Sequence, residues 1–149
     1  MCEYCGCQNV EVIAELTAEH DRLRELGREL SAAADAGDLT RAHQLAGDMR
    51  DLLDPHTAVE ERGLFPLMAG EFPDQMVALA AEHLMIDDVL ADIATASEPM
   101  DWERRAVLVV AQLFDHILKE QDGVFPAALA TLTASEWAGV RAVRDAVSL

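Results

Sequence analysis

The sequence predicts an all-α protein, an antiparallel up-down four-helix bundle with a short C-terminal helix. Apolar residues recur at helical spacing through most of the 149 residues, and alternation typical of strands is nowhere sustained. Glycine and proline breakers divide the chain into four long segments with short connections, as in an antiparallel bundle. The hydrophobic fraction of 51% and the length suit one ordinary core. We therefore expect residues 1–149 to form a single domain.

Breakers and caps define each expected element in turn. The first helix stops at Gly37, the third opens at Pro73, and Asp101 is expected to cap the fourth at its N-terminus. Pro55 is expected to kink the second helix, and residues 133–136 fit a capping box before the last one. The expected ranges are 10–36, about 40–68, 73–97, 101 to about 122, and 133–147, so that the bundle covers about 10–127.

The N-terminal arm, residues 1–9, holds all three cysteines, Cys2, Cys5 and Cys7. An odd number of cysteines bunched at one end is not a disulfide framework. A Cys-x-x-Cys pair could bind metal or change redox state, but no second pair completes a structural zinc site. We therefore expect a short mobile arm.

The charge and the apolar runs exclude several classes of partner. The net charge of −17 would repel nucleic acid and anionic membranes. The longest apolar run, 106–111, is far shorter than the roughly 18 residues that a membrane span needs. The first residues lack a basic region and an apolar stretch, so no secretory signal is visible and a cytoplasmic location is expected.

An internal repeat is the most informative feature of the sequence. Residues 56–66 read HTAVEERGLFP and residues 116–126 read HILKEQDGVFP, so both fit H-x3-E-[EQ]-x-G-[LV]-F-P. Upstream of each, Ala-Glu-His occurs at 18–20 and at 81–83. The repeat therefore predicts two copies of a helical hairpin, related by a pseudo-twofold axis.

Each copy places one histidine on its first helix and a His-x3-Glu pair on its second, all within apolar stripes. Residues four apart are neighbours on a helix face, so each pair can address one point. Burying two carboxylates and four imidazoles without a charge partner would cost many kcal/mol, and a cation at the bundle axis removes that cost. A single such histidine is usually a core residue bonded to a neighbour, which does not explain one on every helix. The candidate metal ligands are His20, His56, Glu60, His83, His116 and Glu120.

This donor set favours two octahedral ions bridged by two carboxylates, with iron the best fit and manganese next. Six nitrogen and oxygen donors exceed the four of a tetrahedral zinc site, and no thiolate lies in the stripes. The Glu-x-x-His spacing of ferritin-like diiron bundles is absent, as is the His-Glu-x-x-His motif of zinc proteases.

On these residues the chain resembles the hemerythrin-like family, the HHE cation-binding domain. The resemblance covers about residues 10–127 and rests on the four histidines and the paired H-x3-E…F-P motifs. It implies a four-helix bundle that holds two Fe ions in a non-haem, oxo-bridged diiron centre. By position, Glu60 and Glu120 would bridge the irons, with His20 and His56 mainly on one iron and His83 and His116 on the other. The start MCEYCGC and the ten arginines against one lysine are similar to actinobacterial members.

Two features depart from the oxygen-carrying members of that family. They place a fifth ligating histidine four residues after the one matching His83, and that position is Asp87 here. Their last bridging carboxylate follows its histidine by five residues, whereas Glu120 follows by four. His43 cannot substitute, because it lies roughly 220° around the helix from His56 and about 20 Å along it. We expect His43 at the surface.

Asp87, Tyr4, water or nothing could fill the vacant coordination position. Asp87 shares a helix face with His83, so it could bind a metal directly or accept a histidine N–H, or it could be a solvated residue. Tyr4 is the only tyrosine, its phenolate suits ferric iron, and an extended arm could span about 20 Å back toward His20.

The remaining positions of the repeat have structural interpretations. Proline at 66 and 126 is expected to bend or end its helix. Phenylalanine at 65 and 125 is expected to pack between helices, well off the metal-facing direction, and glycine at 63 and 123 to allow close backbone approach.

Replacement of the fifth histidine by another ligand leads to a functional hypothesis. Neutral histidines keep a diferrous centre able to bind oxygen reversibly, whereas aspartate or phenolate adds negative charge and favours the ferric state. We therefore predict a diiron protein that reacts with peroxide or O2-type small molecules, and the resemblance implies catalase-like disproportionation of H2O2. The alternative is a protein that binds or senses iron, O2 or NO without turnover. A metal-free structural bundle is the third interpretation.

Overall fold

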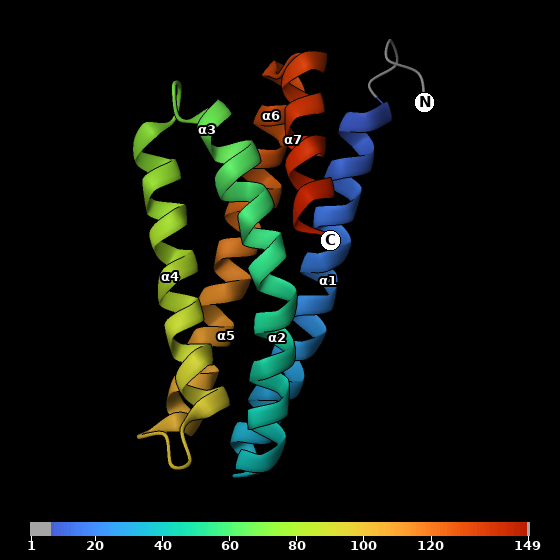
Figure 1. The fold of residues 1–149 in the computed structure, drawn as a ribbon. Coiled ribbons are helices and arrows are strands. Elements are labelled where there is room, and N and C mark those ends of the chain that lie inside the picture. Colours follow the sequence, from blue (N-terminus) through green and yellow to red (C-terminus); the bar gives the residue numbers. More distant parts are fainter. Residues whose placement is uncertain (1–6, 149) are drawn as a thin grey trace.

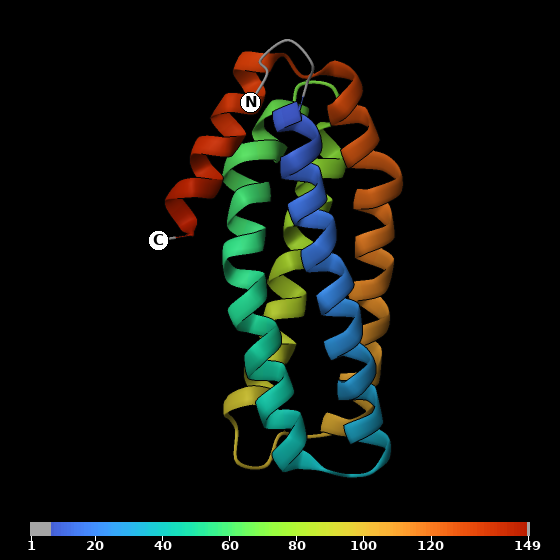
Figure 2. The same cartoon turned by 90° about the vertical axis from the view of Figure 1, so that its right-hand side faces the viewer.

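Long antiparallel helices form a bundle, and a shorter helix lies against one side of it (Figures 1 and 2). The structure, a computed structural model, describes residues 7–148, with side chains from residue 11 onward. The long helices are α1 (Cys7–Asp35), α2 (Leu39–Val59), α4 (Pro73–Thr95) and α5 (Trp102–Lys119). The shorter helix, α7 (Ala134–Val147), packs along α1 and α2. Within residues 7–148 there is no strand, and the predicted helical-bundle class is confirmed.

One of the two predicted caps forms its hydrogen bonds, because Thr133 and Glu136 make the predicted capping box. Asp38, which was not predicted as a cap, accepts a hydrogen bond from the backbone N–H of Arg41 at the start of α2. Asp101 stands at the N-cap of α5 as predicted, but it adopts a left-handed conformation with φ 53° and its side chain makes no capping hydrogen bond. The first helix begins at Cys7, three residues earlier than predicted, and Pro55 lies inside α2, which continues to Val59.

A π-helical turn follows each second-helix segment of the repeat, and neither proline ends its helix. Segment η1 (Glu60–Leu64) leads from α2 into α3 (Phe65–Met68), and η2 (Glu120–Val124) leads from α5 into α6 (Phe125–Thr131). The fourth helical run therefore extends past the predicted end near residue 122. A proline ring clashes with the carbonyl four residues back. The wider turn moves that carbonyl aside, so the helix continues.

Two apolar clusters occupy opposite ends of the bundle. One includes Leu23, Leu30 and Leu113. The other includes Leu16 and Trp137. The six buried polar residues of the repeat interrupt the apolar stripes between these clusters. Water is therefore excluded from above and below this layer. No helix within the described range is both long and apolar enough to cross a membrane.

Candidate metal centre

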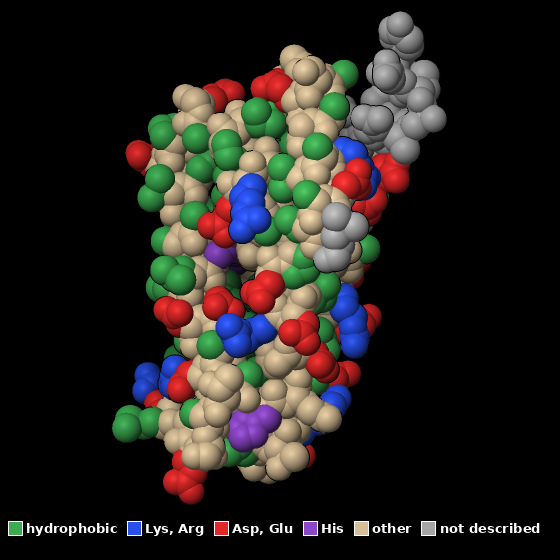
Figure 3. Space-filling view, viewed as in Figure 1, with side chains coloured by type: hydrophobic (Ala, Val, Ile, Leu, Met, Phe, Trp, Pro, Cys, Tyr) green, Lys and Arg blue, Asp and Glu red, His purple; other side chains and the backbone are tan. Residues whose placement is uncertain are grey.

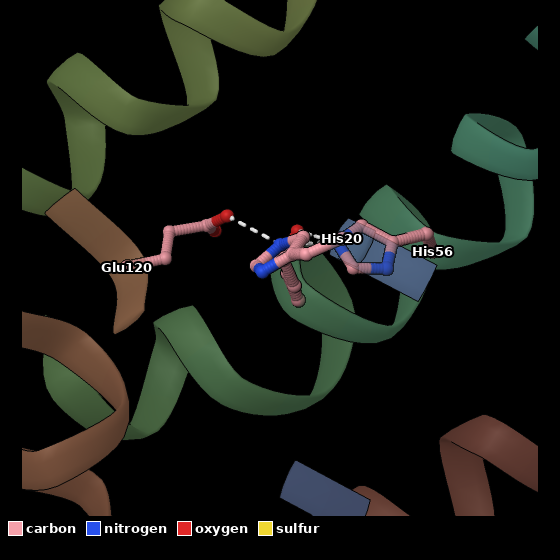
Figure 4. A group of neighbouring side chains, drawn as sticks. His20, His56 and Glu120 are labelled. Atoms are coloured by element: carbon pink, nitrogen blue, oxygen red, sulfur yellow. Dashed lines mark hydrogen bonds and ion pairs between the residues drawn. The ribbon is translucent and has the colours of Figure 1, made fainter. Parts of the chain in front are cut away.

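The four helices bring the six predicted ligands together in one buried layer. His20 comes from α1, His56 from α2, His83 from α4 and His116 from α5. Glu60 and Glu120 are the first residues of the two π-helical turns. All six side chains are at most 8% exposed. Figure 4 shows His20, His56 and Glu120 pointing toward one another from three different segments.

These side chains form two groups that share both glutamates. His20 and His56 form one group with Glu60 and Glu120, and His83 and His116 form the other with the same two carboxylates. Within each group the potential ligand atoms lie within 4.8 Å of one another. Each group therefore offers two imidazole nitrogens and a share of two carboxylates.

The spacing of the donor atoms fits transition-metal ions. The Nε2 atoms of His56 and His116 lie 3.1 and 3.2 Å from the glutamate four residues later. The Nε2 atoms of His20 and His56 are 3.0 Å apart. Two donors bound at right angles, each about 2.1 Å from an ion, stand about 3.0 Å apart. The cluster therefore has the dimensions of a coordination sphere.

Unpartnered buried atoms support the same interpretation. Both carboxylate oxygens of Glu60 and of Glu120 are buried without a hydrogen-bond partner, as is Nε2 of His83 and of His116. A buried charged group without a partner costs several kcal/mol unless a counter-charge satisfies it. Cations between these atoms supply that counter-charge.

A second carboxylate holds the outer nitrogen of each His-x3-Glu histidine. Nδ1 of His56 lies 2.9 Å from Oε1 of Glu19, and Nδ1 of His116 lies 2.9 Å from Oε1 of Glu82. An Nδ1–H that donates to a carboxylate leaves the Nε2 lone pair facing the cluster. Sequence reasoning missed both glutamates as functional residues. The signal was present, because each precedes the first histidine of its repeat in the Ala-Glu-His match.

The residue after each shared glutamate faces the first-helix histidine of the opposite half. Oε1 of Gln121 lies 2.8 Å from Nδ1 of His20. Oε2 of Glu61 lies 3.4 Å from Nδ1 of His83, an ion-pair distance without hydrogen-bond geometry. The [EQ] position of the motif therefore supports the site on both sides, once as an acid and once as an amide.

The phenylalanines of the repeat stack on site histidines, contrary to the prediction. The rings of Phe125 and His20 are parallel within 3° at 5.5 Å, and those of Phe65 and His83 within 13° at 5.6 Å. In a regular α-helix, five residues would turn Phe65 well away from Glu60. The π-helical turn bonds the N–H of Phe65 to the carbonyl of Glu60 and brings the ring back over the cluster.

The charges of the cluster shift the pKa values of its members. Burial lowers the pKa of His56, but the negative charge of Glu60 and the hydrogen bond to Glu19 outweigh it and raise the pKa to about 10. For His116, burial is likewise outweighed by Glu120 and Glu82, which raise the pKa to about 9. Burial raises the pKa of Glu60, yet the nearby histidines hold it well below its usual value. The metal-free cluster therefore stores protons on two of its ligands.

The other candidate ligands lie elsewhere. Asp87 belongs to neither group, because its Oδ1 lies 2.9 Å from Nε of Arg50 on α2. The geometry therefore does not support Asp87 as a direct ligand. His43 lies partly exposed at the surface, far from both groups, and its Nε2 lies 3.0 Å from the carbonyl oxygen of Ala96. Tyr4 lies outside the described residues, so its role as a ligand stays a prediction.

A pocket of about 310 Å³ leads from the surface to the cluster. Its outer part is lined by Asp54, Thr57 and Glu61 on the α2–η1 side and by Leu84 and Asp87 on α4. Figure 3 shows a histidine side chain at the bottom of a hollow between α4 and α2. A small molecule can therefore approach the site from one side, past three carboxylates.

The fold and this site define the class of the protein, a helical bundle with two candidate metal-binding groups of histidines and glutamates in its core. A family model described as the hemerythrin HHE cation binding domain matches residues 11–128. The chain belongs to this family. Searches of curated proteins and of solved structures returned no match.

Proposed function

We propose that this chain is a non-haem diiron protein that reacts with peroxide or O2-type small molecules, with catalase-like disproportionation of H2O2 as the reaction. The observation that carries the proposal is the pair of two-histidine groups that share Glu60 and Glu120. Two nitrogens and two shared carboxylates leave coordination positions open on each octahedral ion.

The donor set assigns each residue a role in holding the ions. Glu60 and Glu120 would bridge two irons, His20 and His56 would bind one, and His83 and His116 the other. When bound, the irons would supply Lewis acidity and redox equivalents for small oxidants. Glu19 and Glu82 orient His56 and His116, and the stacked phenylalanines restrict the other two imidazoles.

The pocket supports a small, uncharged reactant. Its volume of about 310 Å³ lies at the lower end of the range for ligand sites. The carboxylates of Asp54, Glu61 and Asp87 at its mouth disfavour anions and leave neutral H2O2, O2 and NO unaffected. The net charge of −17 also supports small molecules, rather than nucleic acid, as partners.

A second candidate function is binding or sensing of iron, O2 or NO without turnover. The ion pair between Asp87 and Arg50 favours it, because an aspartate ligand was one basis for expecting a stable ferric state. Without that added negative charge, a histidine-rich centre retains the ligands suited to reversible binding. The two candidates share the same metal site and differ in whether the bound molecule is chemically converted.

Metal analysis and a visible spectrum of the purified chain test the shared premise. We expect two irons per chain and the absorption of an oxo-bridged diferric centre. Added peroxide should then give sustained oxygen evolution that His56→Ala abolishes. His43→Ala is the matched control, because His43 lies outside both groups, and this variant should retain activity. A reversible spectral change without turnover would favour the sensing function, and a chain without stoichiometric metal would contradict both.

A further inference from the structure

Helix α7 lies beyond the family match, yet it reaches the metal centre. The match ends at residue 128, whereas α7 spans Ala134–Val147. From α7, Arg144 forms two parallel contacts with Glu19, at 2.9 Å between Nη1 and Oε1 and 2.8 Å between Nη2 and Oε2. The same Oε1 lies 2.9 Å from Nδ1 of His56. A continuous chain of contacts therefore runs from α7 to a candidate metal ligand.

This chain of contacts is sheltered from solvent. The side chains of Arg144 and Glu19 are 15% and 18% exposed, so water screens their interaction less than it screens a surface ion pair. The planar guanidinium fork fixes the orientation of the carboxylate as well as its charge. Nε of Arg144 also lies 2.9 Å from Glu15, which fixes the arginine itself.

The other half of the bundle supports its glutamate differently. Glu82 pairs with Lys119 at 2.7 Å, through a single ammonium group whose side chain is 49% exposed. Lys119 also pairs with Asp115 at 3.2 Å. An ammonium on a flexible stem fixes no plane for the carboxylate that it pairs with. The orientation of His116 is therefore less constrained than that of His56.

We propose that Arg144 is a positioning residue that holds His56 through Glu19, so that the metal position of His20 and His56 is the more firmly organised of the two. The inference rests on the proposed metal site and adds a role for a helix that the family match does not cover. The position of His83 and His116, with Glu61 at the pocket mouth, is the more adaptable one.

The seating of α7 does not depend on Arg144. Trp137 and Val140 of α7 are fully buried in the core cluster at this end of the bundle. A methyl group placed on Gly63 would lie 3.5 Å from the backbone of Val140, so α7 packs closely over η1. Replacing the guanidinium should therefore leave the helix in place, and Trp137 fluorescence can verify this.

Stepwise Co2+ titration of the full-length chain tests the proposal. Arg144→Ala should raise one of the two dissociation constants by about 10- to 100-fold, the usual effect of losing an outer hydrogen-bond partner, and change that position's visible spectrum. Arg144→Lys should recover part of the affinity. Arg141→Ala is the matched control for loss of a guanidinium from α7, because Arg141 shares Glu15 with Arg144 but makes no contact with Glu19. Since both contacts of Arg144 with Glu19 remain in this variant, it should leave both constants close to the wild-type values.

Double variants identify the affected position. In a chain with His83→Ala, adding Arg144→Ala should weaken binding of the remaining ion at His20 and His56. In a chain with His20→Ala, adding Arg144→Ala should change the affinity for the remaining ion little. Equal loss at both positions, or the same loss in Arg141→Ala, would overturn the positioning role. Two unaffected dissociation constants would overturn it while leaving the proposed metal site intact. A wild-type chain that binds no Co2+ would contradict the metal site itself, and the positioning role with it.

Discussion

The half of the bundle formed by α1 and α2 and the half formed by α4 and α5 hold equivalent ligands with different supports. Each offers two histidines to the cluster and one glutamate that faces both groups. Around them, Arg144 and Gln121 support the first half, and Lys119 and Glu61 the second. The repeat therefore preserves the residues of the two candidate groups, and the differences lie in the residues that contact them from outside.

The outer surfaces of the two halves differ as well. Helix α7 covers η1 of the first half, and Val140 packs against Gly63. The equivalent Gly123 of the second half has nothing within 4 Å of a methyl group placed on it, and it lines a largely apolar pocket of about 440 Å³. A helix thus fills on one side the space that stays open on the other. We therefore expect the two proposed metal positions to differ in rigidity.

The largest expected effect is loss of bound metal, and it should differ between a ligand that belongs to both groups and a ligand that belongs to one. Glu120→Gln should lose both ions, because this carboxylate belongs to both groups. His83→Ala should lose only one, because His83 belongs to a single group. Metal content per chain after dialysis measures both outcomes. Loss of one ion in Glu120→Gln, or of both in His83→Ala, would contradict the shared arrangement.

Proton release on metal binding is the next effect, and each half should contribute one proton. The pKa of His56 is raised to about 10 and that of His116 to about 9, so both are protonated in the metal-free chain at pH 7. A metal-bound imidazole must give up that proton, so loading should release about two protons per chain. A pH indicator in weak buffer measures the release.

The sign of the pH dependence is set by the same two groups. Metal affinity should rise with pH up to about pH 9 to 10, the range in which the two histidines lose their protons. Stability of the metal-free chain should change in the opposite direction. Because both pKa values lie above the ordinary 6.5, their contribution is complete below pH 6.5 and is lost as the pH rises through about 9 and 10. Metal affinity that falls between pH 6 and 8 would contradict this assignment.

The sequence predicted the bundle and the cluster because both depend on regular periodicity. A His-x3-Glu pair on an apolar stripe points inward in any regular helix, so His56 and Glu60 could be placed without a structure. The π-helical turns could not be foreseen, because they depart from that regularity. They redirected Phe65 and Phe125 onto the histidines, where an α-helical projection had turned them away.

Contacts between distant segments could not be predicted from the sequence for a different reason. Arg144 meets Glu19 across 125 residues, and only the packing of α7 decides that they meet. The same holds for Asp87, whose helix face was correctly shared with His83 but whose partner on α2 could not be known. Glu19 and Glu82 lay within the repeat and could have been chosen from their symmetry alone.

A smaller effect tests whether α7 makes the halves unequal. Gly63→Leu should displace α7 and cost about 1–3 kcal/mol of unfolding free energy, the usual cost of overpacking. Gly123→Leu should cost less, because its side chain enters the open pocket and leucine favours helix over glycine. Chemical denaturation followed by circular dichroism gives both values, and Trp137 fluorescence reports the seating of α7. Equal destabilisation by the two changes would mean that the halves tolerate added bulk alike.

Exchanging the [EQ] pair should produce the smallest effect, and an unequal one. Gln121→Glu places a carboxylate 2.8 Å from Nδ1 of His20, where a charge-assisted hydrogen bond is roughly twice as strong as a neutral one. The affinity of the His20–His56 position for Co2+ should therefore rise several-fold. Glu61→Gln should change the other position less, because Glu61 is 41% exposed and lies 3.4 Å from His83, so solvent already screens it. Co2+ titrations of both variants against the wild-type chain compare the two responses. Changes of similar size in the two Co2+ affinities would contradict this prediction. They would mean that the shorter contact between Gln121 and His20 does not affect metal affinity.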